Sequence, residues 1–132
     1  MLKDGVISES GYVAYPEANA QAKFEDGMIK LGSTSTNECH FTFTFKEQTN
    51  FANYTKLIIN VASYGKSISI YSSPSIPTSY SLPAGTTLLG YLKNAGTIEI
   101  DLTNVTALGY LAFVGTSPSE TGKTWIDSAM LK

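Results

Sequence analysis

Three neighbouring residues, Glu38, Cys39 and His40, are of the types that bind metals or act as nucleophile and base. In a strand, however, Cys39 and His40 would point to opposite faces. The chain has one cysteine and one histidine, so no second residue of either type can complete a zinc site or a Cys–His pair. We therefore expect a small apolar cysteine beside a surface or half-buried histidine, and no catalytic residue.

Residues 117–124, with the sequence Ser-Pro-Ser-Glu-Thr-Gly-Lys-Thr, come close to a phosphate-binding loop and follow an apolar stretch. That pattern requires glycine where Ser117 stands, and a helix after Thr124 whose N-terminus faces the phosphate. Only eight residues remain after Thr124, and they alternate like a strand. The sequence therefore predicts a surface loop without a nucleotide.

Two carboxylates, Glu99 and Asp101, stand two residues apart and would share one face of a strand. A glycosidase pair is separated by ~5–10 Å, which this spacing fits. Any outward strand face with two acidic residues would fit it equally well. We expect a solvated face here, and with no other catalytic arrangement in the sequence we predict that the protein is not an enzyme and needs no cofactor.

Four of the eight tyrosines lie in or beside predicted loops and strand ends. A tyrosine offers an apolar ring face to a sugar and a hydroxyl to the sugar's edge. The alternative is that half or more of these rings are ordinary rim or core residues. The predicted ligand-binding residues are Tyr64, Tyr71, Tyr80 and Tyr91.

The composition favours sugars or protein neighbours over polyanions. Charged residues make up only 15% of the chain, below the usual quarter, and the net charge is −2 with a pI near 5.3. This gives no basic surface for nucleic acid. No apolar run approaches the ~18 residues of a membrane span, and the first residues contain no apolar signal-peptide core. The single cysteine excludes an intrachain disulfide without identifying a compartment.

Apolar and polar residues alternate along several stretches of the chain, a pattern typical of strands, and it predicts on which strands the side chains discussed above lie. Residues 54–61 and 97–102 are predicted to be central strands. Residues 41–45 carry three phenylalanines on one face, and the Asp-Gly of residues 26–27 predicts a hairpin. About nine strands are expected, with no helical periodicity, in a single all-β domain of 132 residues. The predicted inward rows of the two central strands are Leu57, Ile59 and Val61, and Ile98, Ile100 and Leu102.

The closing segment, residues 124–131, resembles the last strand of jelly-roll carbohydrate-binding modules and galactose-binding-like domains, with an aromatic residue, Ile-Asp and then alternating apolar residues. Residues 51–57 resemble the entry to a central strand of those modules. Residues 98–102 and 110–113 resemble their penultimate pair. Similar arrangements occur in tail and minor structural proteins of phages that infect Gram-positive bacteria.

This resemblance covers roughly residues 38–132. It implies a two-sheet antiparallel jelly-roll β-sandwich, and a non-catalytic module that recognises glycans or a cell surface. The module would belong to a longer protein within an extracellular or phage-tail assembly, outside the cell or on a virion. The alternative is a purely structural or subunit-contact domain without a ligand.

The closing segment also raises the question of a metal. Trp125 and Asp127 are two residues apart, in register with Ala129 and Leu131, which predicts that this row faces the core. A carboxylate there needs hydrogen bonds, or a calcium ion as the corresponding residue often has in the modules that the chain resembles. Calcium needs six or more oxygens. The N-terminal candidates, which lie in no calcium-binding motif, are Glu9, Glu17 and Glu25. We expect a hydrogen-bonded Asp127 and no metal.

Overall fold

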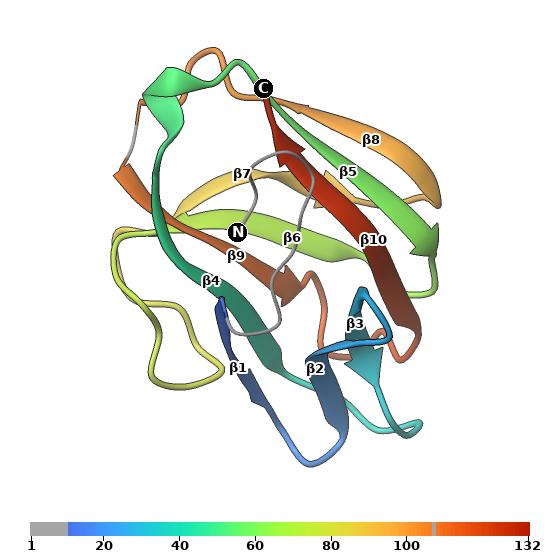
Figure 1. Cartoon of the computed structure of the whole chain (residues 1–132). Helices are drawn as coiled ribbons and strands as arrows, with labels where there is room; N and C mark the ends of the chain where they lie inside the picture. Colours follow the sequence, from blue (N-terminus) through green and yellow to red (C-terminus); the bar gives the residue numbers. More distant parts are fainter. Residues whose placement is uncertain (1–10, 107) are drawn as a thin grey trace.

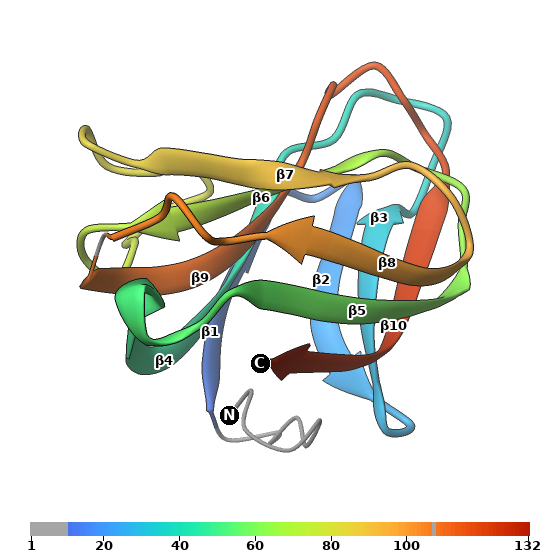
Figure 2. The ribbon, with the colours of Figure 1, turned by 90° about the horizontal axis from the view of Figure 1, so that it is seen from above.

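The computed structural model, which describes residues 11–106 and 108–132, is a β-sandwich of two antiparallel five-stranded sheets with jelly-roll topology (Figure 1). Sheet A has the strand order β1-β4-β9-β6-β7, and sheet B has the order β2-β3-β10-β5-β8. A view from above shows the two sheets as separate layers (Figure 2). The elements are β1 (Tyr12–Pro16), β2 (Ala20–Glu25), β3 (Met28–Ser33), β4 (Phe41–Asn50), the 3-10 helix η2 (Phe51–Asn53), β5 (Lys56–Ser63), β6 (Ile68–Ser73), β7 (Thr87–Leu92), β8 (Gly96–Asp101), β9 (Leu108–Gly115) and β10 (Lys123–Leu131).

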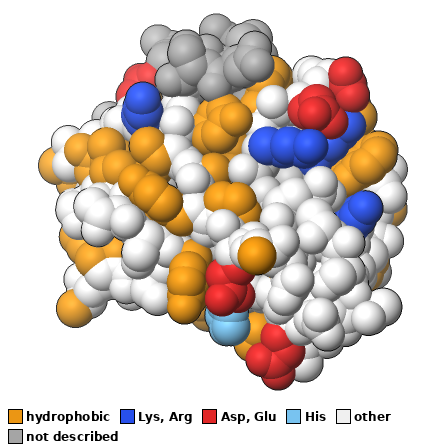
Figure 3. Space-filling model, turned by 90° about the horizontal axis from the view of Figure 1, so that it is seen from below, with side chains coloured by type: hydrophobic (Ala, Val, Ile, Leu, Met, Phe, Trp, Pro, Cys, Tyr) orange, Lys and Arg blue, Asp and Glu red, His pale blue; other side chains and the backbone are white. Residues whose placement is uncertain are grey.

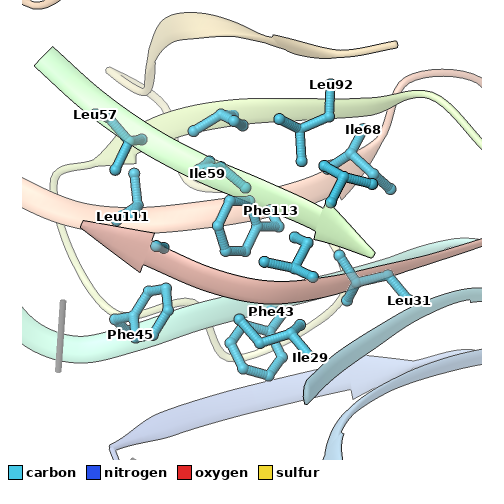
Figure 4. Close-up of a cluster of buried hydrophobic side chains, with 14 of the residues drawn as sticks. Ile29, Leu31, Phe43, Phe45, Leu57, Ile59, Ile68, Leu92, Leu111 and Phe113 are labelled. Atoms are coloured by element: carbon cyan, nitrogen blue, oxygen red, sulfur yellow. The ribbon is translucent and has the colours of Figure 1, made fainter. Parts of the chain in front are cut away.

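One hydrophobic cluster fills the space between the sheets (Figure 4). The three phenylalanines of β4, Phe41, Phe43 and Phe45, are buried in it, as their alternation predicted. Phe43 stacks on Tyr12 of β1 with 4.4 Å between ring centroids. Burial of the three rings contributes on the order of 6 kcal/mol before conformational entropy is counted. Both sheets therefore share a single core.

The predicted inward row of β5 is confirmed, because Leu57, Ile59 and Val61 are all buried. The prediction that residues 97–102 form a central strand was wrong. The strand there, β8, is an edge strand of sheet B, and among the described residues it pairs only with β5. Ile100 and Leu102 are buried, but Ile98 is only half-buried. Alternation shows which face of a strand is buried and does not show how many neighbours the strand has.

The predicted Asp-Gly hairpin is the β2–β3 connection. Asp26 and Gly27 both have positive φ, 55° and 77°, as a two-residue hairpin turn of this kind requires. β2 and β3 pair in register on either side of it, from Glu25 and Met28 onward. The turn therefore fixes the register of this end of sheet B.

The predicted inward row of β10 was right for Ala129 and Leu131, which contribute to the core, and wrong for Trp125 and Asp127. Asp127 is exposed and Trp125 is half-buried, whereas Ile126 and Ala129 are buried. The register of β10 against β5 shifts twice, once after Trp125 and once at Asp127. At the second shift, Asp127 is an extra residue of β10, and such a bulge reverses the alternation of faces between the residues before it and those after it. Counting alternate residues along the sequence could not locate this shift.

Within the described part of the chain, no helix has the length and apolar character that crossing a membrane requires.

Candidate functional site

The outer face of sheet A, the face turned away from the core, gathers tyrosines from four strands. Two rows of outward side chains cross it from β1 through β4, β9 and β6 to β7. The partners in the first row are Tyr15, Thr42, Val114, Ser69 and Tyr91. The partners in the second row are Val13, Thr44, Ala112, Tyr71 and Leu88.

A register shift in β7 places two exposed side chains on this face. Ile70 of β6 pairs with Gly90, and the next residue, Tyr71, pairs with Leu88, so Leu89 is the extra residue and packs against the core. Leu88 and Tyr91, three apart in sequence, consequently both point outward, with 44% and 42% of their surface exposed. We call Tyr71, Leu88 and Tyr91 the platform. Tyr71 and Tyr91 are diagonal neighbours on adjacent strands, within reach of one ligand.

A proline-containing loop, residues 74–86, lies against the same face, and we call it the strap. Figures 1 and 2 show it on the side of sheet A away from sheet B. The Thr42 hydroxyl donates a hydrogen bond to the carbonyl of Ser79, at 3.1 Å. The ring of Tyr80 lies 5.3 Å from the ring of His40. The strap therefore brings Tyr80 to the platform's face of the molecule.

His40 is held in place by a carboxylate. Glu17 accepts from the backbone N–H of His40 at 2.7 Å, and its Oε1 lies 2.5 Å from the ring Nδ1. Figure 3 shows the histidine next to an acidic side chain among hydrophobic ones. Cys39 is buried and His40 is half-buried, as the sequence predicted. His40 therefore supports the strap through Tyr80.

The structure places Tyr64 apart from the other predicted ligand-binding residues. It lies in the turn between β5 and β6, at the opposite end of β6 from the strap, and its hydroxyl is 3.0 Å from Ser67 Oγ. Tyr71, Tyr80 and Tyr91 do lie on one face. Sequence reasoning missed Leu88 and the outward Tyr15 and Tyr110. Alternation in β1 and β9 carried the signal for the two tyrosines, but no pattern revealed the β7 shift.

The segment that resembles a phosphate-binding loop encloses a buried lysine. Lys66 is fully buried, and its ammonium donates to the carbonyl of Ser117 at 2.7 Å and to that of Glu120. The hydroxyl of Thr124 accepts from the backbone N–H of Lys66 at 2.9 Å. Because β10 starts at Lys123, a strand stands where a phosphate-binding loop requires a helix, and residues 117–122 form a loop as predicted, whereas Lys123 and Thr124 already belong to the strand.

The two carboxylates of β8 are each engaged by a neighbour. Glu99 pairs with the Lys56 ammonium at 3.1 Å. Asp101 accepts from the backbone N–H of Thr103 at 2.9 Å and from its hydroxyl at 2.7 Å, and these bonds hold the pKa of Asp101 below its ordinary value, the backbone bond most strongly. An open hollow of about 310 Å³ adjoins both residues. This arrangement is a solvated, ion-paired strand face.

The outer face of sheet B carries the only tryptophan. The Lys30 ammonium lies 4.5 Å from the centroid of the Trp125 ring and is held by Glu25 at 3.2 Å and Asp26 at 3.0 Å. The hydrogen bond from Lys30 makes the largest contribution to lowering the pKa of Glu25, and the bond to Asp26 makes the largest contribution to raising the pKa of Lys30. These charges are therefore satisfied by one another.

Asp127 accepts a hydrogen bond from the side-chain amide of Asn60, at 3.3 Å. Within residues 11–106 and 108–132, no group of three side chains of the metal-binding types comes together. Of the acidic candidates for a metal, Glu9 lies outside the described residues, Glu17 binds His40 and Glu25 binds lysines. Asp127 is thus hydrogen-bonded, although on the outside of the sandwich.

Known structures with a similar fold are family 29 carbohydrate-binding modules. A variant in complex with cellulohexaose matches with a TM-score of 0.62 at 10% identity, covering 98% of this chain and 87% of that one. A variant in complex with mannohexaose gives 0.63 at 11%, with 98% and 87% covered. A family 29 module from Piromyces equi gives 0.54 at 8%, with 92% and 81% covered. This chain has the fold of these modules.

No model of a known protein family matches the sequence, and no curated protein matches it.

Proposed function

We propose that the protein is a non-catalytic module that binds a glycan on the outer face of sheet A. The observation that carries the proposal is the platform, where Tyr71, Leu88 and Tyr91 point outward together, while Tyr80 of the strap lies against His40 on the same face of the molecule. Sugar rings stack their apolar faces on such side chains, and tyrosine hydroxyls bond their edges. The likeness to modules whose structures hold cellulohexaose and mannohexaose supports the same conclusion.

The module would act as one domain of a longer protein, within an extracellular assembly such as a phage tail or another cell-surface structure. Its partners would be a cell-surface polysaccharide and neighbouring domains or subunits. Tyr64, at the far end of β6, would contact only a glycan long enough to extend along that strand. The composition, poor in charge and rich in hydroxyl and amide side chains, supports this setting.

A glycan array followed by calorimetry with cellulohexaose and mannohexaose tests the proposal. We expect Tyr91→Ala to weaken binding about fivefold, because a stacked ring contributes on the order of 1 kcal/mol, while the melting temperature stays nearly unchanged. Tyr71→Ala should act in the same direction. The control is Ile58→Ala on the outer face of sheet B, which should retain binding.

Two results would contradict the proposal. If no glycan on the array binds, the platform is not a sugar site. If Tyr91→Ala abolishes folding, the ring belongs to the packing of the domain. In either case the structural or subunit-contact alternative would stand, and the exposed apolar side chains of Leu88 and Leu108 would be the contact to test by analytical ultracentrifugation.

A further inference from the structure

Thr44 is buried although its side chain lies on the outer face of sheet A, not on the face that is turned toward the core. Its neighbours Phe43 and Phe45 point into the core, so the Thr44 side chain points outward, yet it has no exposed surface. Its cross-strand partner Ala112 is likewise fully buried without belonging to the core cluster. The middle of the outer face of sheet A is therefore closed to solvent, and the strap, which bonds Thr42 two residues along β4, lies against this same face.

The Thr44 hydroxyl has no hydrogen-bond partner among the described residues. A hydroxyl can donate one hydrogen bond and accept two, and burying it unpartnered is unfavourable. The adjacent outward threonine on the same strand, Thr42, does have a partner, the Ser79 carbonyl of the strap. The covered face therefore holds one hydroxyl that the strap satisfies and one that it does not.

The strap is held down by few contacts. Besides the Thr42–Ser79 bond and the His40–Tyr80 ring contact, the polar contacts found for it are local ones, from Thr86 to Pro83 at 2.7 Å, from Ser73 to Ser75 at 2.6 Å and from the backbone N–H of Ser81 to the Ser79 hydroxyl at 3.2 Å. Most of its residues are exposed, and its three prolines have no backbone N–H to donate. Segments with few buried contacts open at lower free energy than the sheets that they cover.

We propose that the strap is a movable cover over an inner part of the glycan site, and that a sugar hydroxyl becomes the partner of Thr44 when the strap lifts. This inference rests on the proposed function. Thr42, released from Ser79, would then bond the same sugar, whose apolar face would lie against Tyr71, the outward neighbour of Ala112. Glycan would bind only the open form, so its apparent affinity depends on the fraction of molecules that are open.

Thiol labelling tests the cover without any glycan. A T44C/C39S variant carries its only thiol beneath the strap, and the buried Cys39 of the wild type reports opening of the core. With Ellman's reagent we expect the T44C thiol to react at least tenfold faster than Cys39, at a rate that low urea barely changes. Adding Y80A should accelerate the reaction several-fold. Y64A, which removes a tyrosine of similar exposure away from the strap, should not.

Glycan binding tests the role of the hydroxyl, with cellulohexaose and mannohexaose as probes. We expect T44V to weaken binding several-fold while the melting temperature stays the same or rises, because the variant removes an unpartnered hydroxyl at constant shape. T44S, which restores the hydroxyl, should recover binding. A bound hexasaccharide should also change the labelling rate of the T44C thiol.

Each failure has its own signature. If the T44C thiol reacts no faster than Cys39, or Y80A leaves its rate unchanged, the strap is a fixed part of the fold and the inference is overturned. If Y91A loses glycan binding while T44V keeps it, the platform stands and the inner site is wrong. If the strap opens but no glycan binds the wild type, the proposed function fails, and the assignment of the strap to a glycan site fails with it.

Discussion

At the scale of single residues, Lys66 shows how a charged side chain can become part of the interior. Its ammonium lies beneath the loop of residues 116–122 and donates to two main-chain carbonyls. Gly65, beside it, has no room for a side chain, because a Cβ there would lie 2.6 Å from the carbonyl oxygen of Lys123. The β5–β6 turn and the β9–β10 loop are therefore joined at backbone distance, with Lys66 as the hydrogen-bond donor between them.

Replacing Lys66 by methionine keeps the length of the side chain and removes the donor. We expect Lys66→Met to lower the free energy of unfolding by about 2 kcal/mol, because two carbonyls lose their partner in a closely packed place. The loop of residues 116–122 should become more sensitive to limited proteolysis. Lys46→Met, at an exposed lysine of β4, should leave both the melting temperature and the cleavage pattern unchanged.

Glu25 makes the stability of the fold depend on pH. Hydrogen bonds from Lys30 and then Lys23 lower its pKa from the ordinary value of 4.5. A carboxyl with a lowered folded-state pKa stabilises the fold above its unfolded pKa, and this contribution is lost as the pH falls through the folded value. The raised pKa of Lys30 contributes stability that is fully present below its ordinary value of 10.5 and is lost only as the pH rises through the folded value, so it adds no pH dependence in the acid range.

The melting-temperature difference between wild type and Glu25→Gln should accordingly be constant from pH 7 to about pH 5 and shrink below about pH 4.5. The same substitution in a Lys30→Gln background should show a smaller difference with less dependence on pH. A difference that grows on acidification would contradict the assigned direction of the Glu25 pKa.

At the scale of elements, the bulge in β10 decides which residues of the last strand face the core. Asp127 stands outside and bonds Asn60, and Ala129 lies in the core cluster. The bulge also leaves Trp125 on the outer face, against Lys30. A single extra residue thus separates an aspartate and an alanine that simple alternation puts side by side.

We expect Asp127→Ala to change the free energy of unfolding by about 0.5 kcal/mol or less, because an exposed, weakly bonded carboxylate contributes little. Ala129→Asp should prevent folding, because it places an unpaired charge in the core. Thermal unfolding followed by circular dichroism distinguishes the two. If both substitutions had large effects, or both had small ones, the two side chains would share a face and the strand would lie without the bulge.

At the scale of the whole molecule, both sheets contribute to one core cluster, and nothing divides the described chain into independent units. We therefore propose that the domain unfolds as one unit. Tryptophan emission, which reports on sheet B, and far-UV circular dichroism should show the same transition midpoint. Helical minima in the native spectrum would contradict the fold. Two separate midpoints would show that the sheets unfold independently.

Removing metal ions tests whether the stability of the whole molecule depends on a structural ion. We expect EDTA to leave the melting temperature unchanged, because the Asn60 amide and solvent satisfy Asp127 where it lies. Far-UV spectra recorded before and after chelation should coincide. A large fall that added calcium reverses would reveal a structural ion and overturn the metal-free prediction.

The sequence by itself determined the fold class and most of the strands, because these depend on local pattern. The alternation of Phe41, Phe43 and Phe45, the Asp26-Gly27 turn and the inward row of β5 are written in neighbouring residues. The residue pattern around residues 117–124 also argued correctly against a phosphate-binding loop there. For the candidate site, it supplied tyrosines at strand ends, of which Tyr71, Tyr80 and Tyr91 lie on one face.

Only the tertiary structure decided the rest. The edge position of β8, the shift that exposes Leu88 beside Tyr91, and the bulge at Asp127 all depend on strands paired from distant parts of the chain. The strap lies against the outer face of sheet A because of contacts between residues 37 and 40 positions apart. Alternation along a strand shows which face of the sheet a side chain lies on only as long as no bulge shifts the register. Register is set by the partner strand, which the local sequence does not contain.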